Sequence, residues 1–404
     1  MIKKKTIVVI ATLDNKGPET KYLKERIESR GGNSIVIDTS TAGEPYFVAD
    51  ITREQVAEAS GTNLAQVLAI RDAGEAQLMI RPGTITIVKD LYSAGRLDGI
   101  ICLGGGMGSA LGITVMRELP IGVPKILVTT VPRGKFVGTT DVTTMPTVTD
   151  LAGLNRITMR VLANAAAAIV AMAEASEEKI LEKPIVVMSM LGSTSRCAMQ
   201  VKSALEDKYE VMIFHTTGPG GRALEDLVRT ATSIVSVIEL GLGEIASHML
   251  GGISMAGPDR LQAAGERGIP QIITLGNVDF IVFGEIGGVP SKYKRRRLHS
   301  HNPYVTLMRL NVAESRKLGR IIARKLNKAI GQVHVVIPTR GFSQFDAEDG
   351  IWYDPETDKA LIATLKSTLN KSIVVKEIDA NINDPGFAEV IMKDFFEMIE
   401  KGKR

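Results

Sequence analysis

The sequence predicts an α/β protein of two Rossmann-like domains, each an open, mostly parallel sheet with helices on both faces. Short runs of β-branched residues, bounded by turn residues, alternate with helix-length segments along the whole chain. Hydrophobic residues make up 44% of the 404 residues, which is enough for parallel sheets buried on both faces. Because this length exceeds what one ordinary core fills, we expect two domains.

The first half of the chain is expected to contain four strands, at residues 6–11, 34–38, 99–103 and 125–128. Helices are expected at residues 18–29 and 110–118, and over an interrupted stretch from 51 to 94. An alanine-rich helix over 155–178 then runs into a charged stretch closed by Pro184. Such stretches separate domains, so we predict a nucleotide-binding domain at residues 1–180 and a second domain at residues 181–404.

The second domain repeats the alternation of strands and helices. Strands are predicted at residues 185–190, 211–214, 233–239, 271–275, 333–337 and 373–378. In open sheets of this class, ligands bind beyond the carboxyl ends of the strands, where the strand order reverses. We therefore expect a substrate or effector site at that edge.

Composition limits the functional classes. The net charge of +4 is small for this length, and aromatic residues make up only 4%, so a nucleic-acid partner is not expected. Two cysteines and no signal-peptide pattern indicate a reducing, cytoplasmic environment. The longest apolar stretch, residues 161–173, is too short to span a membrane.

The strand at residues 99–103 leads into a glycine-dense turn, followed by a helix. The turn contains Gly104, Gly105, Gly106 and Gly108, and it ends at Ser109. Backbone N–H groups and the helix dipole favour an anion at such a place, which predicts a phosphate-bearing ligand. No Walker A motif occurs, and Ser109 stands where a dinucleotide fingerprint has its last glycine. The alternative is a tight turn that needs glycine only for its backbone angles.

Polar residues follow the first strand at the same predicted sheet edge. Thr12 supplies a hydroxyl, Asp14 a carboxylate and Lys16 an ammonium group. Lys16 suits phosphate charge, and Asp14 suits a magnesium ion bound directly or through water. The alternative is that Asp14 or Asn15 caps the next helix.

Three further residues are candidates for the same site. Asp38 ends the second strand, where a ribose hydroxyl would be bound. Thr129 and Asp141 follow the strand at 125–128, and Asp141 is either a second metal-facing acid or a turn residue.

The second domain has two polar turns that resemble small-anion sites. Ser193 and Ser195 follow its first strand, and a histidine precedes a glycine-rich helix start after the next strand. Helix capping is the alternative for both turns. No nucleophile elbow is present, so a serine hydrolase is not expected. The expected cleft residues of this domain are Ser193, Ser195, His215, Thr216, Thr217 and Gly220.

Two other segments carry charge or metal-binding groups. His299 and His301 are spaced to chelate a metal, but no further histidine or cysteine motif accompanies them. The basic run Lys292–Arg297 suits an anionic ligand or a solvated surface loop, and it contains one aromatic residue, Tyr293.

Taken together, these segments resemble a known family: the ATP-binding domain of the tomato mosaic virus resistance protein and its uncharacterised stand-alone bacterial relatives. The resemblance covers essentially the whole chain. It rests on the segments 11–17, 104–109, 150–155, 214–222, 256–261, 301–309 and 382–385.

The family resemblance implies ATP with Mg2+ in the first domain, and a homodimer. Thr12, Asp14, Lys16, the Gly104–Ser109 turn and Asp141 fall on matching segments. The chain departs from the family at residues 239–244, where Glu239-Leu-Gly-Leu-Gly-Glu244 replaces a stretch rich in threonine. That departure removes three hydroxyls from a loop of the second domain.

We therefore expect an ATP-binding protein with the nucleotide phosphates on a non-Walker glycine loop. If it is an enzyme, the expected chemistry is phosphoryl transfer or another ATP-driven reaction on a small molecule in a cleft between the domains. The alternative is a nucleotide-gated regulatory module that acts through dimerisation or domain closure. A third reading has the glycine turn hold a phosphorylated metabolite.

Overall fold

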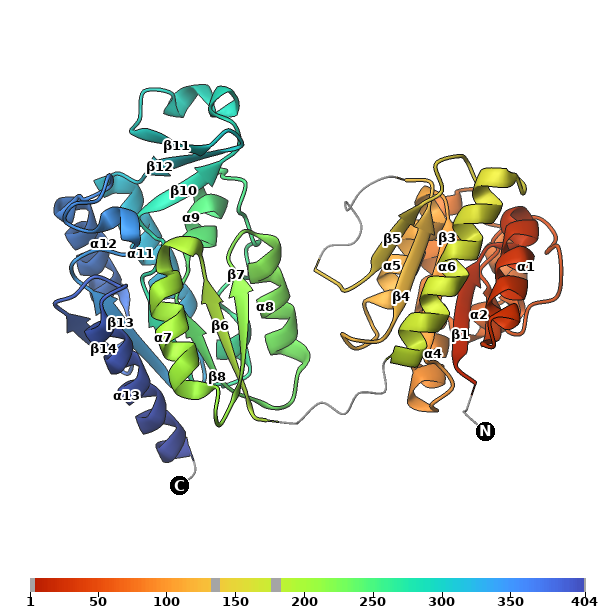
Figure 1. Ribbon diagram of the computed structural model, residues 1–404, viewed down its shortest axis with the longest axis horizontal. Helices are drawn as coiled ribbons and strands as arrows, with labels where there is room; N and C mark the ends of the chain where they lie inside the picture. The colour runs from red at the N-terminus through yellow and green to blue at the C-terminus, as the bar shows by residue number, and fades with distance from the viewer. Residues whose placement is uncertain (1–3, 132–138, 176–182, 403–404) are drawn as a thin grey trace. The chain divides into compact units, whose positions relative to one another are not determined.

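The computed structural model describes residues 4–131, 139–175 and 183–402. The chain divides into two compact units, residues 1–180 and 181–404 (Figure 1). Each unit contains its own parallel sheet with helices on both faces, so the predicted fold class is confirmed.

The first unit is built on a five-stranded parallel sheet with the order β2-β1-β3-β4-β5. Its strands are β1 (Thr6–Ala11), β2 (Asn33–Asp38), β3 (Gly99–Gly104), β4 (Lys125–Thr129) and β5 (Thr143–Pro146). Its helices are α1 (Leu13–Ser29), α2 (Arg53–Ala59), α3 (Leu64–Leu68), α4 (Ala73–Ser93), α5 (Gly106–Met116) and α6 (Arg156–Ala175). The predicted helix over 155–178 corresponds to α6, and its last three residues lie outside the described part of the chain.

Alternate strand residues pack against helices on opposite faces of this sheet. Val9 and Ile101 face α1 and α6, whereas Val8 and Ile100 face α2, α4 and α5. Within the described ranges, α6 is the one helix long and apolar enough to cross a membrane. One face of α6 is buried against the sheet, for example at Leu162, so this helix forms part of the core of the first unit.

The second unit contains a six-stranded parallel sheet with the order β14-β13-β9-β8-β6-β7. Its strands are β6 (Ile185–Met190), β7 (Glu210–His215), β8 (Ile234–Glu239), β9 (Gln271–Thr274), β13 (Val333–Pro338) and β14 (Val374–Ile378). Its α-helices are α7 (Ser195–Leu205), α8 (Pro219–Thr230), α9 (Gly243–Leu250), α10 (Ala263–Glu266), α11 (Val312–Leu326), α12 (Pro355–Thr368) and α13 (Pro385–Gly402). Helices α7 and α13 cover one face of this sheet, and the other α-helices pack against the opposite face.

A small antiparallel sheet, absent from the sequence-based prediction, stands at one end of the second unit (Figure 1). Its order is β10-β12-β11, from β10 (Phe280–Phe283), β11 (Leu298–Asn302) and β12 (Val305–Arg309). Short 3-10 turns at Gly192–Thr194, Ile286–Gly288, Ser291–Tyr293 and Gln344–Asp346 complete the unit.

Each parallel sheet has one point where its strand order reverses. In the first unit this point lies between β1 and β3, and in the second it lies between β6 and β8. The carboxyl ends of these strands are where ligands bind in this architecture. The turn after β3 and the segment after β1 therefore meet at one edge.

Candidate functional site

The glycine turn joins β3 to α5 and leaves the start of that helix open. Gly105 is the N-cap residue, and it has no side chain to cap the helix. The first N–H groups of a helix have no partner within the helix, so those of α5 are available to an anion. A Cβ at Gly104 would lie 2.9 Å from the Gly108 Cα, whereas one at Gly106 would find its nearest neighbour 3.9 Å away. Gly104 is thus needed by the turn itself, and the backbone at Gly106 borders open space.

The two hydroxyl residues predicted for this turn lie beneath it. Ser109 and Thr129 are buried, and their Oγ and Oγ1 atoms are 2.7 Å apart. Thr129 Oγ1 also accepts a hydrogen bond from the backbone N–H of Val131 at 3.0 Å. These contacts hold the turn on the ends of β3 and β4, so both side chains support the backbone.

The segment after β1 is the first turn of α1, which begins earlier than predicted, at Leu13. Asp38 Oδ1 accepts a hydrogen bond from the Leu13 N–H at 3.1 Å, and Ser40 Oγ accepts one from the Asp14 N–H at 3.0 Å. Asp38 is only 1% exposed. The alternative that Asp14 or Asn15 caps this helix does not hold, because Asp38 and Ser40, at and just after the end of β2, accept its first N–H groups. Asp38 was predicted to bind a ribose hydroxyl, but its carboxylate instead accepts the hydrogen bond from the backbone N–H of Leu13.

Asp14 and Lys16 remain as the charged groups of this edge. Asp14 Oδ1 is buried without a hydrogen-bond partner among the described residues. Burial, together with the nearby Asp38 carboxylate, raises the pKa of Asp14. Lys16 departs from helical backbone angles, at φ −125° and ψ 19°, and bends the start of α1. Thr12, the N-cap residue, donates its hydroxyl proton to Asn15 Oδ1 at 2.7 Å.

Asp141 belongs to the opposite edge of the sheet, which corrects the prediction that it joins the glycine turn. It precedes β5 by two residues and lies near the start of β4. There it accepts hydrogen bonds from the buried Lys125 Nζ at 2.8 Å and from the Gly122 N–H at 2.7 Å. The chain returns to the amino edge between β4 and β5, so a residue that follows β4 in sequence is not at its carboxyl end.

The glycine-rich start of α8 in the second unit already holds an anion from within the chain. Glu244 Oε1 accepts hydrogen bonds from the backbone N–H groups of Gly218, at 2.6 Å, and Gly221, at 3.1 Å. A Cβ at Gly221 would lie 1.9 Å from Glu244 Oε2. The glycines thus make room for a carboxylate of α9, and the prediction of an anion site at this helix start is wrong.

Glu244 is part of a buried charge cluster around Arg260, which is fully buried. The guanidinium donates to Glu239 through both Nη atoms at 2.6 Å, and to Glu244 through Nε at 2.8 Å. A third carboxylate, Glu225, accepts from Nη1 at 3.2 Å. One cation thus faces three carboxylates, and burial raises the pKa of Glu244 despite the attraction of Arg260.

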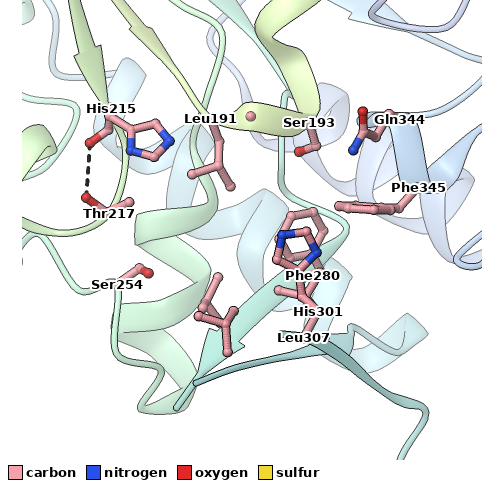
Figure 2. A pocket seen from close by; sticks show the side chains of 13 residues that line it. Leu191, Ser193, His215, Thr217, Ser254, Phe280, His301, Leu307, Gln344 and Phe345 are labelled. Carbon is pink, nitrogen blue, oxygen red and sulfur yellow. Dashed lines mark hydrogen bonds between the residues drawn. The ribbon is translucent and has the colours of Figure 1, made fainter. Parts of the chain in front are cut away.

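A cavity of about 330 Å³ opens at the carboxyl edge of the second sheet (Figure 2). Three of the predicted cleft residues line it: Ser193, His215 and Thr217. Its other lining residues are Leu191, Gly192, Ser254, Phe280, Val282, His301, Val305, Leu307, Gln344 and Phe345.

The other three predicted cleft residues are not among the cavity lining. The Thr216 hydroxyl donates to the Met190 carbonyl at 3.0 Å, and that of Ser195 donates to the Gly192 carbonyl at 2.8 Å. Gly220 packs against the backbone of His215. The wall formed by β10, β12 and the turn at Gln344–Asp346 was not predicted from the sequence. The apolar run Phe280–Phe283 and the largely apolar residues 305–308 are signals that would have indicated it.

The basic run and the histidine pair lie beside aromatic rings. Arg296 forms a two-pronged ion pair with Glu314, and Arg297 lies 5.4 Å above the Trp352 ring. His299 packs edge-on against Trp352 with ring centroids 6.1 Å apart. The residues that the structure describes contain no group of three or more histidine, cysteine or acidic side chains able to hold a metal.

Comparisons with known proteins agree with the family resemblance. Models of the N-terminal and C-terminal domains of an uncharacterised protein family (UPF0261) match residues 5–178 and 183–399. A UPF0261 protein of Clostridium tetani is 39% identical over 98% of this chain and 100% of its own. One from Rhizobium meliloti is 36% identical over 95% of this chain and 97% of its own. The ToMV susceptible protein tm-1(GCR26) of Solanum lycopersicum is 33% identical over 98% of this chain and 56% of its own length.

Solved structures resemble the chain only weakly. A putative UDP-N-acetylglucosamine 2-epimerase from Listeria monocytogenes aligns over 67% of this chain and 79% of its own, at 10% identity and a TM-score of 0.23.

Proposed function

The chain belongs to the uncharacterised protein family UPF0261, and we propose that its first domain binds ATP with the phosphates on the Gly104–Ser109 turn. One contrast carries the proposal. Two helices begin where the strand order reverses, α1 and α5. The start of α1 is closed by Asp38 and Ser40, whereas the start of α5 has no capping side chain. The resemblance to an ATP-binding family supports the choice of nucleotide.

Mg2+ fits the remaining acid of this edge. Asp14 has a buried carboxylate oxygen without a partner among the described residues, which a cation or its bound water would satisfy. A single carboxylate with phosphate oxygens and water is a usual magnesium environment. When bound, the ion would neutralise phosphate charge, and Lys16 would add a second positive charge from the bend in α1.

Introducing a negative charge at the glycine turn tests the proposal. We expect Gly106→Asp to weaken binding of Mg-ATP at least about tenfold, because it sets a carboxylate against phosphate. Gly106→Asn has the same shape without the charge, so it should weaken binding far less. Isothermal titration calorimetry measures both variants against the unsubstituted protein. Equal affinities for the two variants, or no ATP binding by the unsubstituted chain, would contradict the proposal.

Whether ATP is turned over and whether the chain forms a homodimer need separate experiments. Phosphate release measured with ATP and a pool of small metabolites distinguishes an ATP-driven enzyme from a nucleotide-gated regulator. We further propose a homodimer, as the family resemblance implies, and light scattering with and without ATP tests it. Both cysteines are free and buried, which supports a cytoplasmic protein.

A further inference from the structure

The cavity belongs to the second unit, whereas the glycine turn belongs to the first. A ligand in this cavity would therefore be additional to the ATP proposed above. We propose that it binds an uncharged aromatic or heteroaromatic molecule about the size of two fused rings. The apolar body of this ligand would lie on the cavity floor, and its polar end would face the mouth. The volume of about 330 Å³ is within the range of small-molecule sites.

The floor of the cavity is apolar and partly aromatic. Phe280 on β10 and Leu307 on the neighbouring strand β12 are 2% and 4% exposed. Phe345 packs edge-to-face against Phe280, with ring centroids 5.7 Å apart and planes at 76°. Rings in this arrangement offer a face and an edge to a third ring, which favours a planar ligand.

The mouth of the cavity carries imidazole and amide side chains that can form hydrogen bonds (Figure 2). His215, His301 and Gln344 are exposed there, and each can accept or donate a hydrogen bond. Ser193 lies deeper and is 3% exposed. Its Oγ accepts a hydrogen bond from Asn277 Nδ2, so the hydroxyl proton is left for a ligand acceptor.

The nearby cationic groups are already engaged by carboxylates of the chain. No lysine, arginine, aspartate or glutamate lines the cavity in the described residues. The N–H groups at the start of α8 are occupied by Glu244, and the donors of Arg260 are shared among three glutamates. An anionic group placed in the cavity would therefore give up hydration without gaining a lysine or arginine partner among the described lining residues.

Buried polar contacts hold the wall of the cavity in place. Arg309 on β12 donates to the Asp279 carbonyl at 2.9 Å and to Asp346 Oδ1 at 3.1 Å. Ser343, two residues before Phe345, donates to Asp279 Oδ2 at 2.7 Å. These bonds connect β10, β12 and the turn that carries Gln344 and Phe345, so the cavity is formed before a ligand arrives.

A blocking substitution tests the site in the full-length protein. Gly192 lines the cavity, and a Cβ there meets no atom within 4 Å. Gly192→Phe should therefore fold and obstruct the cavity. Gly386→Phe is the matched control, because Gly386 also has no atom within 4 Å of its Cβ and does not line the cavity. Thermal unfolding of both variants checks that they fold.

The probes are indole-3-carboxamide and its acid, indole-3-carboxylate, observed by saturation-transfer NMR without nucleotide. We expect the amide to bind the unsubstituted chain and Gly386→Phe equally, and to bind Gly192→Phe at least about tenfold more weakly. The acid should bind the unsubstituted chain at least about tenfold more weakly than the amide. Failure of the amide to bind at millimolar concentration, unchanged binding by Gly192→Phe, or tighter binding of the acid would each overturn the proposal. None of these results depends on ATP.

Discussion

At the scale of single residues, two carboxylates decide which helix starts are open to a ligand. Asp38 reaches across from the end of β2 to the start of α1, and Glu244 reaches across from α9 to the start of α8. Both act as internal substitutes for a bound anion. Among the described residues no side chain caps the helix that follows the glycine turn, which favours this turn over the start of α1 as the proposed phosphate site.

Asp14 gives a residue-scale prediction with a defined pH dependence. Burial and the Asp38 charge raise its pKa in the folded protein, so its stabilising contribution is present in acid and is lost as the pH rises through the folded pKa. Asp14→Asn should therefore raise the unfolding temperature at neutral pH, and this gain should disappear in acid. Thermal melts across pH measure the difference. MgCl2 should stabilise the Asp14 protein more than the variant.

The control for this substitution is Asp90→Asn, an exposed change on α4. It should leave both the pH profile and the magnesium response unchanged. A lower unfolding temperature for Asp14→Asn at neutral pH would contradict this prediction, because it would mean that the Asp14 carboxylate stabilises the folded protein.

The glycine turn was predictable from the sequence, but the capping of helix starts by Asp38 and Glu244 was not. Gly104 to Ser109 follow one another in sequence, so their shared role can be read from a short pattern. Asp38 caps a residue 25 positions earlier, and Glu244 one 26 positions earlier. Those pairings depend on which strands are neighbours, and a local pattern does not contain that information.

At the scale of elements, the Arg260 cluster holds α8, α9 and β8 together through one buried guanidinium. Arg260→Met would leave three buried carboxylates without their cation. We expect it to lower the free energy of unfolding by about 3 kcal/mol or more. Chemical denaturation measures the loss.

Arg229 provides the matched control for this substitution. It also approaches Glu225, at 3.9 Å, but its side chain is 32% exposed. Arg229→Met should cost less than about 1 kcal/mol, because water screens exposed ion pairs. Equal losses for the two variants would contradict the role given to burial.

Most strands of the two parallel sheets were predictable because they are short apolar runs rich in β-branched residues, but β5 (Thr143–Pro146) was missed because it is mostly exposed and ends in proline. The segments predicted at 6–11 and 185–190 are β1 and β6 without any shift. The antiparallel sheet was missed because β11, Leu-His-Ser-His-Asn, has no apolar run. Its two histidines were noted only for a spacing that could chelate a metal, without an accompanying motif, and His299 packs on Trp352. The contact that explains them lies more than fifty positions away in sequence.

At the scale of the whole molecule, each unit has a core of its own. The first sheet is enclosed by α1 and α6 on one face and by α2, α4 and α5 on the other. The second sheet is enclosed in the same way by helices from its own half of the chain. Units with complete cores fold independently, since neither depends on the other to bury its apolar surface.

The division into two units with separate cores predicts how each half of the chain behaves as a fragment. A fragment of residues 1–180 should fold and bind Mg-ATP within about threefold of the affinity of the full chain. A fragment of residues 181–404 should fold and show no ATP binding. Circular dichroism melts establish folding, and calorimetry with ATP measures affinity. Gly106→Asp introduced into the first fragment is the control that ties its binding to the glycine turn. A folded first fragment that no longer binds ATP would mean that the second unit supplies part of the nucleotide site, and the assignment to one domain would have to be abandoned.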